Sequence, residues 1–160
     1  MIVLALDPSI NHLGWTYMGP GVVLEFGTIN APTEFKQMSD VERINWMVEM
    51  VNDIGQGEYD TVAIECPEPW GAYKSMASSR SGSLQILTLL TGALTYWACN
   101  EVGIENVKLV KVSQHKGQLP KHVTQKRMGK KYKCEFATSH EADAVNLGDY
   151  VLNLHSTNGR

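Results

Sequence analysis

The chain has 160 residues, 43% of them hydrophobic, and a formal net charge of −3. This length predicts a single domain, residues 1–160, with a sizeable core. The sequence has no apolar run long enough to cross a bilayer, no signal-like start and only three scattered cysteines, so we expect a cytoplasmic protein that does not engage a membrane.

The first part of the chain is predicted to form three strands. Residues 2–6 are continuously apolar, as in a strand buried on both faces, and they end at the turn signal Asp-Pro-Ser of residues 7–9. Residues 14–18 and 22–29 are two further strand candidates, joined through Gly-Pro-Gly. This spacing predicts a hairpin meander.

Helices and strands alternate in the rest of the chain. Ser39 and Glu42 form a predicted capping box at the start of an amphipathic helix that ends at Gly55. The later elements are expected to be a strand at 61–65, a loop at 68–80, a long apolar helix at 84–102, a strand at 107–112 and a last helix at 141–154. The core candidates in that last helix are Ala142, Val145, Tyr150 and Leu154. Strands that alternate with helices pair in parallel, which predicts an α/β fold with a mixed five-stranded sheet and helices on both faces.

Positive charge is concentrated in one segment. Residues 103–133 hold nine basic side chains and one acidic side chain, whereas residues 1–102 have a balance of −8. A local basic surface is what binding to a polyanion requires. The alternative is a solvated basic connection between two elements.

Acidic side chains follow two of the predicted strands. Asp7 and Glu65 each come directly after an apolar run, and the carboxyl ends of parallel strands meet at the edge where open sheets place their ligands. Asp143 lies near the start of the last helix, on one helical face with His140 and not with Glu141. Taken singly, these residues are also typical of turns and of helix N-termini.

Carboxylates held close together stay ionised when a cation joins them. Oxygen-rich sites of this kind suit Mg²⁺ or Mn²⁺. Two such ions can activate a water and stabilise the leaving oxygen in phosphodiester hydrolysis, so the acids predict a two-metal nuclease site.

Three motifs carry a resemblance to a known family. The run IVLALDPSINHLGW (2–15) resembles the first motif of the RuvC-type Holliday junction resolvases, in which an apolar strand ends in Asp-Pro-Gly/Ser and a Gly-aromatic pair follows. VAIECPEP (62–69) and HEADAVNLG (140–148) resemble the second and third motifs. The resemblance covers nearly the whole chain and implies a ribonuclease-H-like fold.

The resemblance implies a metal-dependent endonuclease that cuts four-way DNA junctions with two bound Mg²⁺ or Mn²⁺ ions in each active site. It assigns Asp7, Glu65, His140 and Asp143 to catalysis and metal binding, with Glu141 as a possible substitute for His140. It also implies a homodimer, in which the helix at 84–102 would supply much of the contact. An apolar helix of this length is equally expected in a core.

The resemblance also points to DNA-binding residues. An exposed aromatic after the second motif would stack on bases at the opened junction, although Trp70 could equally pack under its own loop. Phosphate contacts would position the DNA backbone without reading its bases. The candidates are Trp70, Tyr73, Lys74, Arg80, Lys116, Lys121, Lys126 and Arg127. The abundance of lysine at 126–133 departs from the family pattern.

Three alternatives remain open at this point. The first is a ribonuclease-H-like nuclease that cuts other branched DNA or RNA–DNA hybrids with the same carboxylates. The second is an ATPase of the actin and sugar-kinase superfamily, although this chain has the length of only one lobe and lacks the glycine-rich phosphate loops. The third is a junction-binding protein without catalysis.

Overall fold

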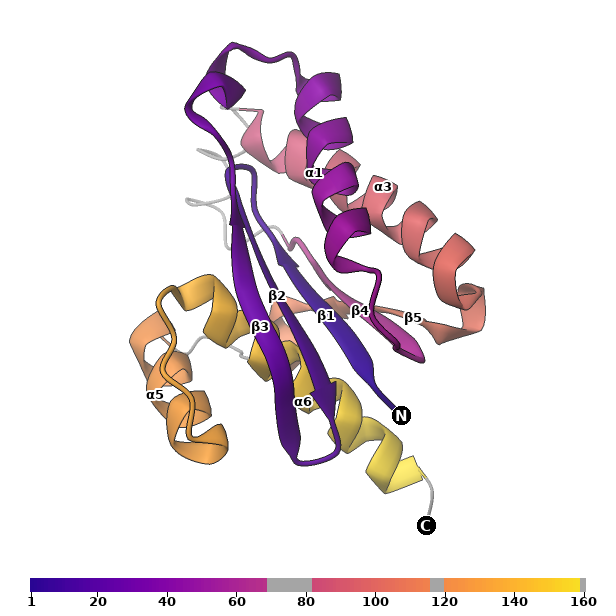
Figure 1. Ribbon diagram of the computed structural model, residues 1–160, viewed down its shortest axis with the longest axis vertical. Helices are drawn as coiled ribbons and strands as arrows, with labels where there is room; N and C mark the ends of the chain where they lie inside the picture. The colour runs from indigo at the N-terminus through magenta and orange to yellow at the C-terminus, as the bar shows by residue number, and fades with distance from the viewer. Residues whose placement is uncertain (69–81, 116–119, 159–160) are drawn as a thin grey trace.

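The computed structural model describes residues 1–68, 82–115 and 120–158, and Figure 1 shows a twisted sheet with helices on either side. The sheet has five strands in the order β3-β2-β1-β4-β5. The pairs β1–β2 and β2–β3 are antiparallel, and the pairs β1–β4 and β4–β5 are parallel. The strands are β1 (Val3–Pro8), β2 (His12–Gly19), β3 (Val22–Asn30), β4 (Thr61–Cys66) and β5 (Val107–Lys111). The predicted mixed sheet is confirmed.

Long helices cover the two faces of this sheet. The first face packs against α1 (Asp40–Ile54) and α3 (Ser83–Val102), and the second against α6 (Ser139–Asn158). The capping box at Ser39 is present, and the Ser39 amide donates to the Glu42 carboxylate at 2.7 Å. The shorter helices are η1 (Thr33–Gln37), η2 (Ile104–Asn106), α4 (Val112–His115) and α5 (Lys121–Tyr132).

Alternation along the central strands divides the core into two layers. On β1, Leu4 and Leu6 pack with α1 and α3, whereas Val3 and Ala5 pack with α6. A strand buried on both faces is continuously apolar, which is the pattern of β1. Asp7 follows Ala5 by two residues and therefore lies on the α6 face.

Two features differ from the sequence-based expectations. The basic segment contains a helix, α5, which packs on α6 and has Thr124 and Met128 as buried residues. Leu154 is not a core residue: its exposed fraction is 43%, and it lines a surface pocket beside Val107 and Leu109 of β5. No helix in the described part of the chain is both long and apolar enough to cross a membrane.

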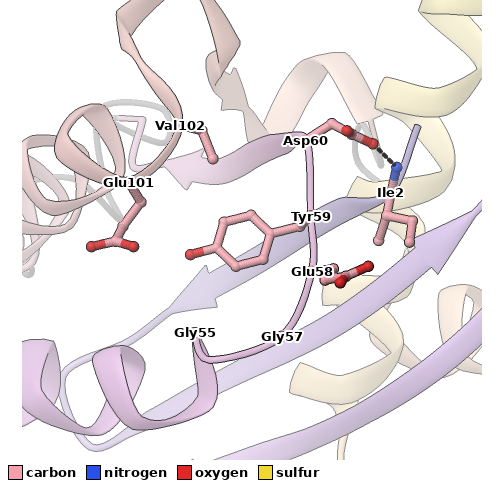
Figure 2. A pocket seen from close by; sticks show the side chains of 8 residues that line it. All are labelled: Ile2, Gly55, Gly57, Glu58, Tyr59, Asp60, Glu101 and Val102. Carbon is pink, nitrogen blue, oxygen red and sulfur yellow. Dashed lines mark hydrogen bonds between the residues drawn. The ribbon is translucent and has the colours of Figure 1, made fainter.

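A pocket of about 340 Å³ opens at the amino-terminal ends of β1 and β4 (Figure 2). Asp60 accepts a hydrogen bond from the Ile2 amide there at 2.6 Å. The Tyr59 hydroxyl is buried and has no hydrogen-bond partner among the described residues. This pocket is at the opposite end of the strands from Asp7 and Glu65.

Candidate functional site

Two carboxylates lie side by side at the carboxyl ends of the central parallel strands. The parallel pairing of β1 and β4 runs to Leu6 opposite Ile64, so Asp7 and Glu65 occupy the next position on each strand. Both face α6, because Ala5 and Ala63 precede them by two residues on that face. Asp7 is 4% exposed, and the Glu65 side chain is 12% exposed.

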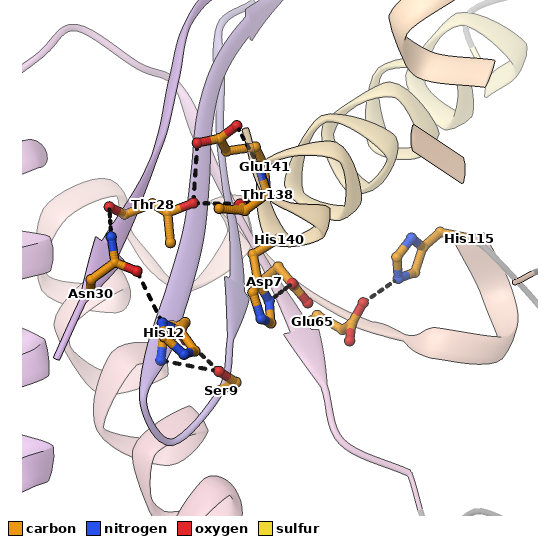
Figure 3. A network of polar contacts seen from close by, with 10 residues as sticks. All are labelled: Asp7, Ser9, His12, Thr28, Asn30, Glu65, His115, Thr138, His140 and Glu141. Carbon is orange, nitrogen blue, oxygen red and sulfur yellow. Dashed lines mark hydrogen bonds and ion pairs between the residues drawn. The ribbon is translucent and has the colours of Figure 1, made fainter. Parts of the chain in front are cut away.

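The first turn of α6 lies directly over Asp7. The His140 Nδ1–H group donates to Asp7 Oδ2 at 2.8 Å (Figure 3). This approach is possible because Gly14, which pairs with Asp7 across β1 and β2, has no side chain. A Cβ atom at Gly14 would clash with the backbone carbonyl oxygen of His140. Asp143, one turn further along α6, is only 2% exposed.

Glu141 has a different role in the structure from its neighbour His140. Its carboxylate accepts hydrogen bonds from the amides of Ala137 and Thr138 at 2.7 and 3.2 Å, and from the Thr28 hydroxyl at 3.2 Å. These contacts hold the chain that leads into α6 against β3. Of the two residues, the structure therefore places His140, and not Glu141, against Asp7.

Sequence reasoning missed a second histidine in the site. The Nε2 atom of His115, on α4, lies 2.7 Å from Glu65 Oε2 (Figure 3). The Asn146 side-chain amide lies 3.1 Å from both His115 Nδ1 and the His115 carbonyl oxygen. The spacing His140-x-x-Asp143-x-x-Asn146 was a readable signal for Asn146, because these positions share one helical face. Nothing in the sequence pointed to His115.

A third histidine stands beside His140. The His12 ring stacks on the His140 ring with 5.7 Å between centroids and an interplanar angle of 28°. Asn30 Oδ1 lies 3.0 Å from His12 Nδ1, and the Asn30 amide donates to the Thr28 carbonyl. The exposed His12 ring therefore lies at the edge of the site.

The donor chemistry of these residues fits a hard divalent cation. Asp7 and Glu65 supply carboxylate oxygens at one sheet edge, and Asp143 is a further, buried carboxylate near the start of α6. Oxygen ligands of this kind are the ones that such ions prefer. Within residues 1–68, 82–115 and 120–158, no three His, Cys, Asp or Glu side chains form a ready-made metal cluster. Both strand carboxylates instead accept a hydrogen bond from a histidine ring.

The predicted DNA-binding residues divide between described and undescribed parts of the chain. Lys126 and Arg127 are exposed on α5, with Lys130 one turn further along. Lys121 begins α5, and its side chain is not described. The remaining candidates lie outside the described residues: Trp70, Tyr73, Lys74, Arg80 and Lys116.

Comparison with known proteins identifies the fold. No family model and no curated protein matches the sequence. The structure of T. thermophilus RuvC in complex with Holliday junction substrate superposes with a TM-score of 0.71 and 19% identity, covering 98% of this chain and 96% of that one. A second Thermus thermophilus RuvC structure has a TM-score of 0.61 and 20% identity, covering 98% and 97%. The chain therefore has the ribonuclease-H-like fold of the RuvC structures.

Proposed function

We propose that this protein is a metal-dependent endonuclease that cuts four-way DNA junctions. The observation that carries the proposal is the meeting of Asp7, Glu65 and His140 at one sheet edge. These residues meet in a chain whose fold matches, over 98% of its length, that of a RuvC bound to Holliday junction substrate. No other cluster of carboxylates in the described residues has this position at the carboxyl ends of parallel strands.

In this proposal Asp7, Glu65 and Asp143 provide the carboxylates that hold Mg²⁺ or Mn²⁺. The bound ions would supply an activated water and stabilise the leaving oxygen of a phosphodiester. The His140 Nδ1–H group donates to Asp7, so a neutral His140 ring keeps its lone pair on Nε2. That nitrogen is then available to bind a metal ion, whereas a protonated ring would instead donate from Nε2 to an oxygen of the scissile phosphate. Hydrolysis would leave a 5′-phosphate.

The exposed cations of α5 provide a surface for the DNA backbone. Lys126 and Lys130 lie one turn apart, with Arg127 beside them, and each contact that neutralises a phosphate releases bound counterions. Lys131 is also exposed but already pairs with Asp149 at 2.7 Å. We therefore assign phosphate binding to Lys126, Arg127 and Lys130.

We also propose that two copies act together, one on each of two opposing strands of the junction. The exposed face of α3 carries Leu89 and Tyr96, which are 60% and 75% exposed, with Gly92 between them. This spacing of three and four residues makes a continuous helix face. A small residue at its centre allows the α3 helices of two copies to approach closely, and the resemblance to RuvC-type enzymes implies such a dimer.

The decisive test is cleavage of a labelled synthetic four-way junction by the wild type and by Asp7→Asn, with and without Mg²⁺. We expect paired symmetric nicks from the wild type in Mg²⁺ and a loss of about 100-fold or more in Asp7→Asn, since even residues behind metal ligands cost 10- to 100-fold. Junction binding should persist, because the substitution removes a negative charge near the DNA. Asp53→Asn makes the same chemical change at an exposed position on α1 and should cut like the wild type.

Other outcomes would change the assignment. Equal cutting by the wild type and Asp7→Asn would remove Asp7 from the mechanism. Junction binding without cutting in any divalent metal would identify a non-catalytic junction-binding protein. Faster cutting of flaps, forks or RNA–DNA hybrids than of four-way junctions would support the proposed nuclease activity but show that four-way junctions are not its preferred substrate.

A further inference from the structure

His115, at the end of α4, contacts a proposed metal-binding carboxylate. Its side chain is fully buried, and its Nε2 atom lies 2.7 Å from Glu65 Oε2. Two contacts hold the short α4 helix in place for this bond. Glu68 accepts from the Ser113 amide and hydroxyl at 2.8 and 3.1 Å, and Gln114 accepts from the Lys111 amide at 2.8 Å.

The hydrogen bonds of Asn146 determine which ring nitrogen of His115 carries the proton. A backbone carbonyl oxygen only accepts, so the atom of Asn146 that faces the His115 carbonyl at 3.1 Å is the NH₂ nitrogen. The same NH₂ group lies 3.1 Å from His115 Nδ1. It donates its second hydrogen there, and Nδ1 must therefore be the unprotonated nitrogen.

The proton of a neutral His115 ring is consequently on Nε2, where it is donated to Glu65. This tautomer leaves no lone pair on the nitrogen that faces the carboxylate, so His115 in this arrangement acts on Glu65 and is not itself a metal ligand. A hydrogen bond from a ring N–H restricts the carboxylate to one orientation. Groups behind metal ligands commonly act in this way.

We propose that His115 is a positioning residue for Glu65 and that Asn146 selects the His115 tautomer that can do so. The proposal rests on the proposed function of Glu65 as a metal-binding carboxylate. Through these contacts α6 acts on both strand acids. It reaches Asp7 directly through His140, and it reaches Glu65 through Asn146 and His115.

The first measurement needs no variant and no metal. Nitrogen-15 NMR of the histidine rings in the metal-free wild type should show His115 with a protonated Nε2 and an unprotonated Nδ1. The His115 signals are assigned by comparison with His115→Gln. An Nδ1-protonated His115 ring in the wild type would overturn the proposal.

The second measurement is direct Mn²⁺ binding by calorimetry, without DNA. His115→Leu removes both ring nitrogens and should weaken Mn²⁺ binding by about 10- to 100-fold. His115→Gln keeps an N–H donor of similar reach and should recover most of the lost affinity. The matched control is His155→Gln, an exposed histidine near the end of α6, which should bind Mn²⁺ like the wild type.

Asn146→Ala tests the link between the two residues. It should weaken Mn²⁺ binding in the wild-type background and have no further effect beside His115→Leu, because the two residues act on Glu65 through one ring. Additive losses would show that Asn146 acts by another route and would overturn the assigned role of Asn146. Thermal unfolding of each variant establishes whether it is folded. If His115→Leu does not fold, the NMR measurement of the His115 tautomer in the wild type still tests the proposal.

The outcomes separate this proposal from the proposed function. The wild type could bind Mn²⁺ and cut junctions while His115→Leu binds Mn²⁺ equally or more tightly. In that case the positioning role of His115 is wrong, and the proposed nuclease function is still supported. If the wild type binds no Mn²⁺, both proposals fail. Loss of Mn²⁺ binding in His115→Leu with recovery in His115→Gln establishes the positioning role.

Discussion

Two tyrosine hydroxyl groups near the carboxyl end of α1 differ in their hydrogen bonding. The Tyr17 hydroxyl donates to the Ile54 carbonyl at 2.5 Å. The Tyr59 hydroxyl, whose ring lies 5.8 Å from that of Tyr17, is buried without a partner among the described residues. Burial and the charge of Glu101 raise the pKa of Tyr59 to about 12.

This difference predicts opposite effects of removing each hydroxyl. Tyr17→Phe should lower the free energy of unfolding by about 1 kcal/mol, because the Ile54 carbonyl loses its partner, whereas Tyr59→Phe should leave it unchanged or raise it by up to about 1 kcal/mol. Urea denaturation at neutral pH measures the change in the free energy of unfolding in each variant. An equal loss in both variants would show that the Tyr59 hydroxyl is bonded in solution.

The raised pKa of Tyr59 adds a pH dependence to the same experiment. The folded state favours the neutral phenol, so its contribution to stability is complete below the ordinary pKa of 10.0 and is lost as the pH rises through about 12. Tyr59→Phe should therefore lose less stability than the wild type over this range. Denaturation curves at pH 9 and 11 provide the comparison.

At the scale of secondary-structure elements, the contact between β2 and the first turn of α6 sets the geometry of the site. Gly14 lies opposite Asp7 on the neighbouring strand and directly under the His140 backbone. A side chain there would meet a backbone carbonyl, which cannot rotate away. The start of α6 would have to shift, and His140 would move with it.

Gly14→Ala should therefore lower the free energy of unfolding by about 1–3 kcal/mol and reduce junction cleavage, as His140 moves away from Asp7. Gly19→Ala on the same strand is the matched control, since a Cβ atom there meets only Val22 Cγ1 at 3.4 Å. Thermal unfolding and cleavage rates compare the two variants. Equal behaviour of Gly14→Ala and Gly19→Ala would contradict the proposed role of this contact.

The elements also show what could be predicted from the sequence. β1 and β4 were predictable because a short, continuous apolar run is typical of a strand that is buried on both faces of a sheet. α5 was not, because its sequence KHVTQKRMGKKY has almost no apolar stripe and its helical state depends on packing against α6. The pairing of His115 with Glu65 could not be predicted either, since the position of α4 depends on the tertiary contact between Ser113 and Glu68.

For the whole molecule, the exposed face of α3 is the surface on which the proposed dimer depends. Tyr96→Glu would place a charge in the proposed apolar contact between two copies, one helical turn from Gly92 at its centre, and unpaired charges at such contacts are strongly unfavourable. We expect the dimer dissociation constant to rise about 100-fold or more, as is typical when a large aromatic residue that contributes strongly to an interface is replaced. Sedimentation velocity measures this change.

Val41→Glu is the control, because Val41 is 76% exposed on α1 and lies outside the proposed contact. The Tyr96→Glu monomer should nick one strand of a junction without the paired second cut. A wild-type protein that sediments as a monomer at micromolar concentration would remove the dimer from the proposal.

The bond between His140 and Asp7 joins residues 133 positions apart in the chain. At a synthesis rate of roughly 5–20 residues per second, Asp7 leaves the ribosome on the order of ten seconds before His140 does. During the later part of that interval, after Glu65 has been added, the growing chain holds both Asp7 and Glu65 but lacks the helix that faces them. If the proposed function is right, the site is incomplete on an unfinished chain, and we expect products that end before α6 to show no cutting activity.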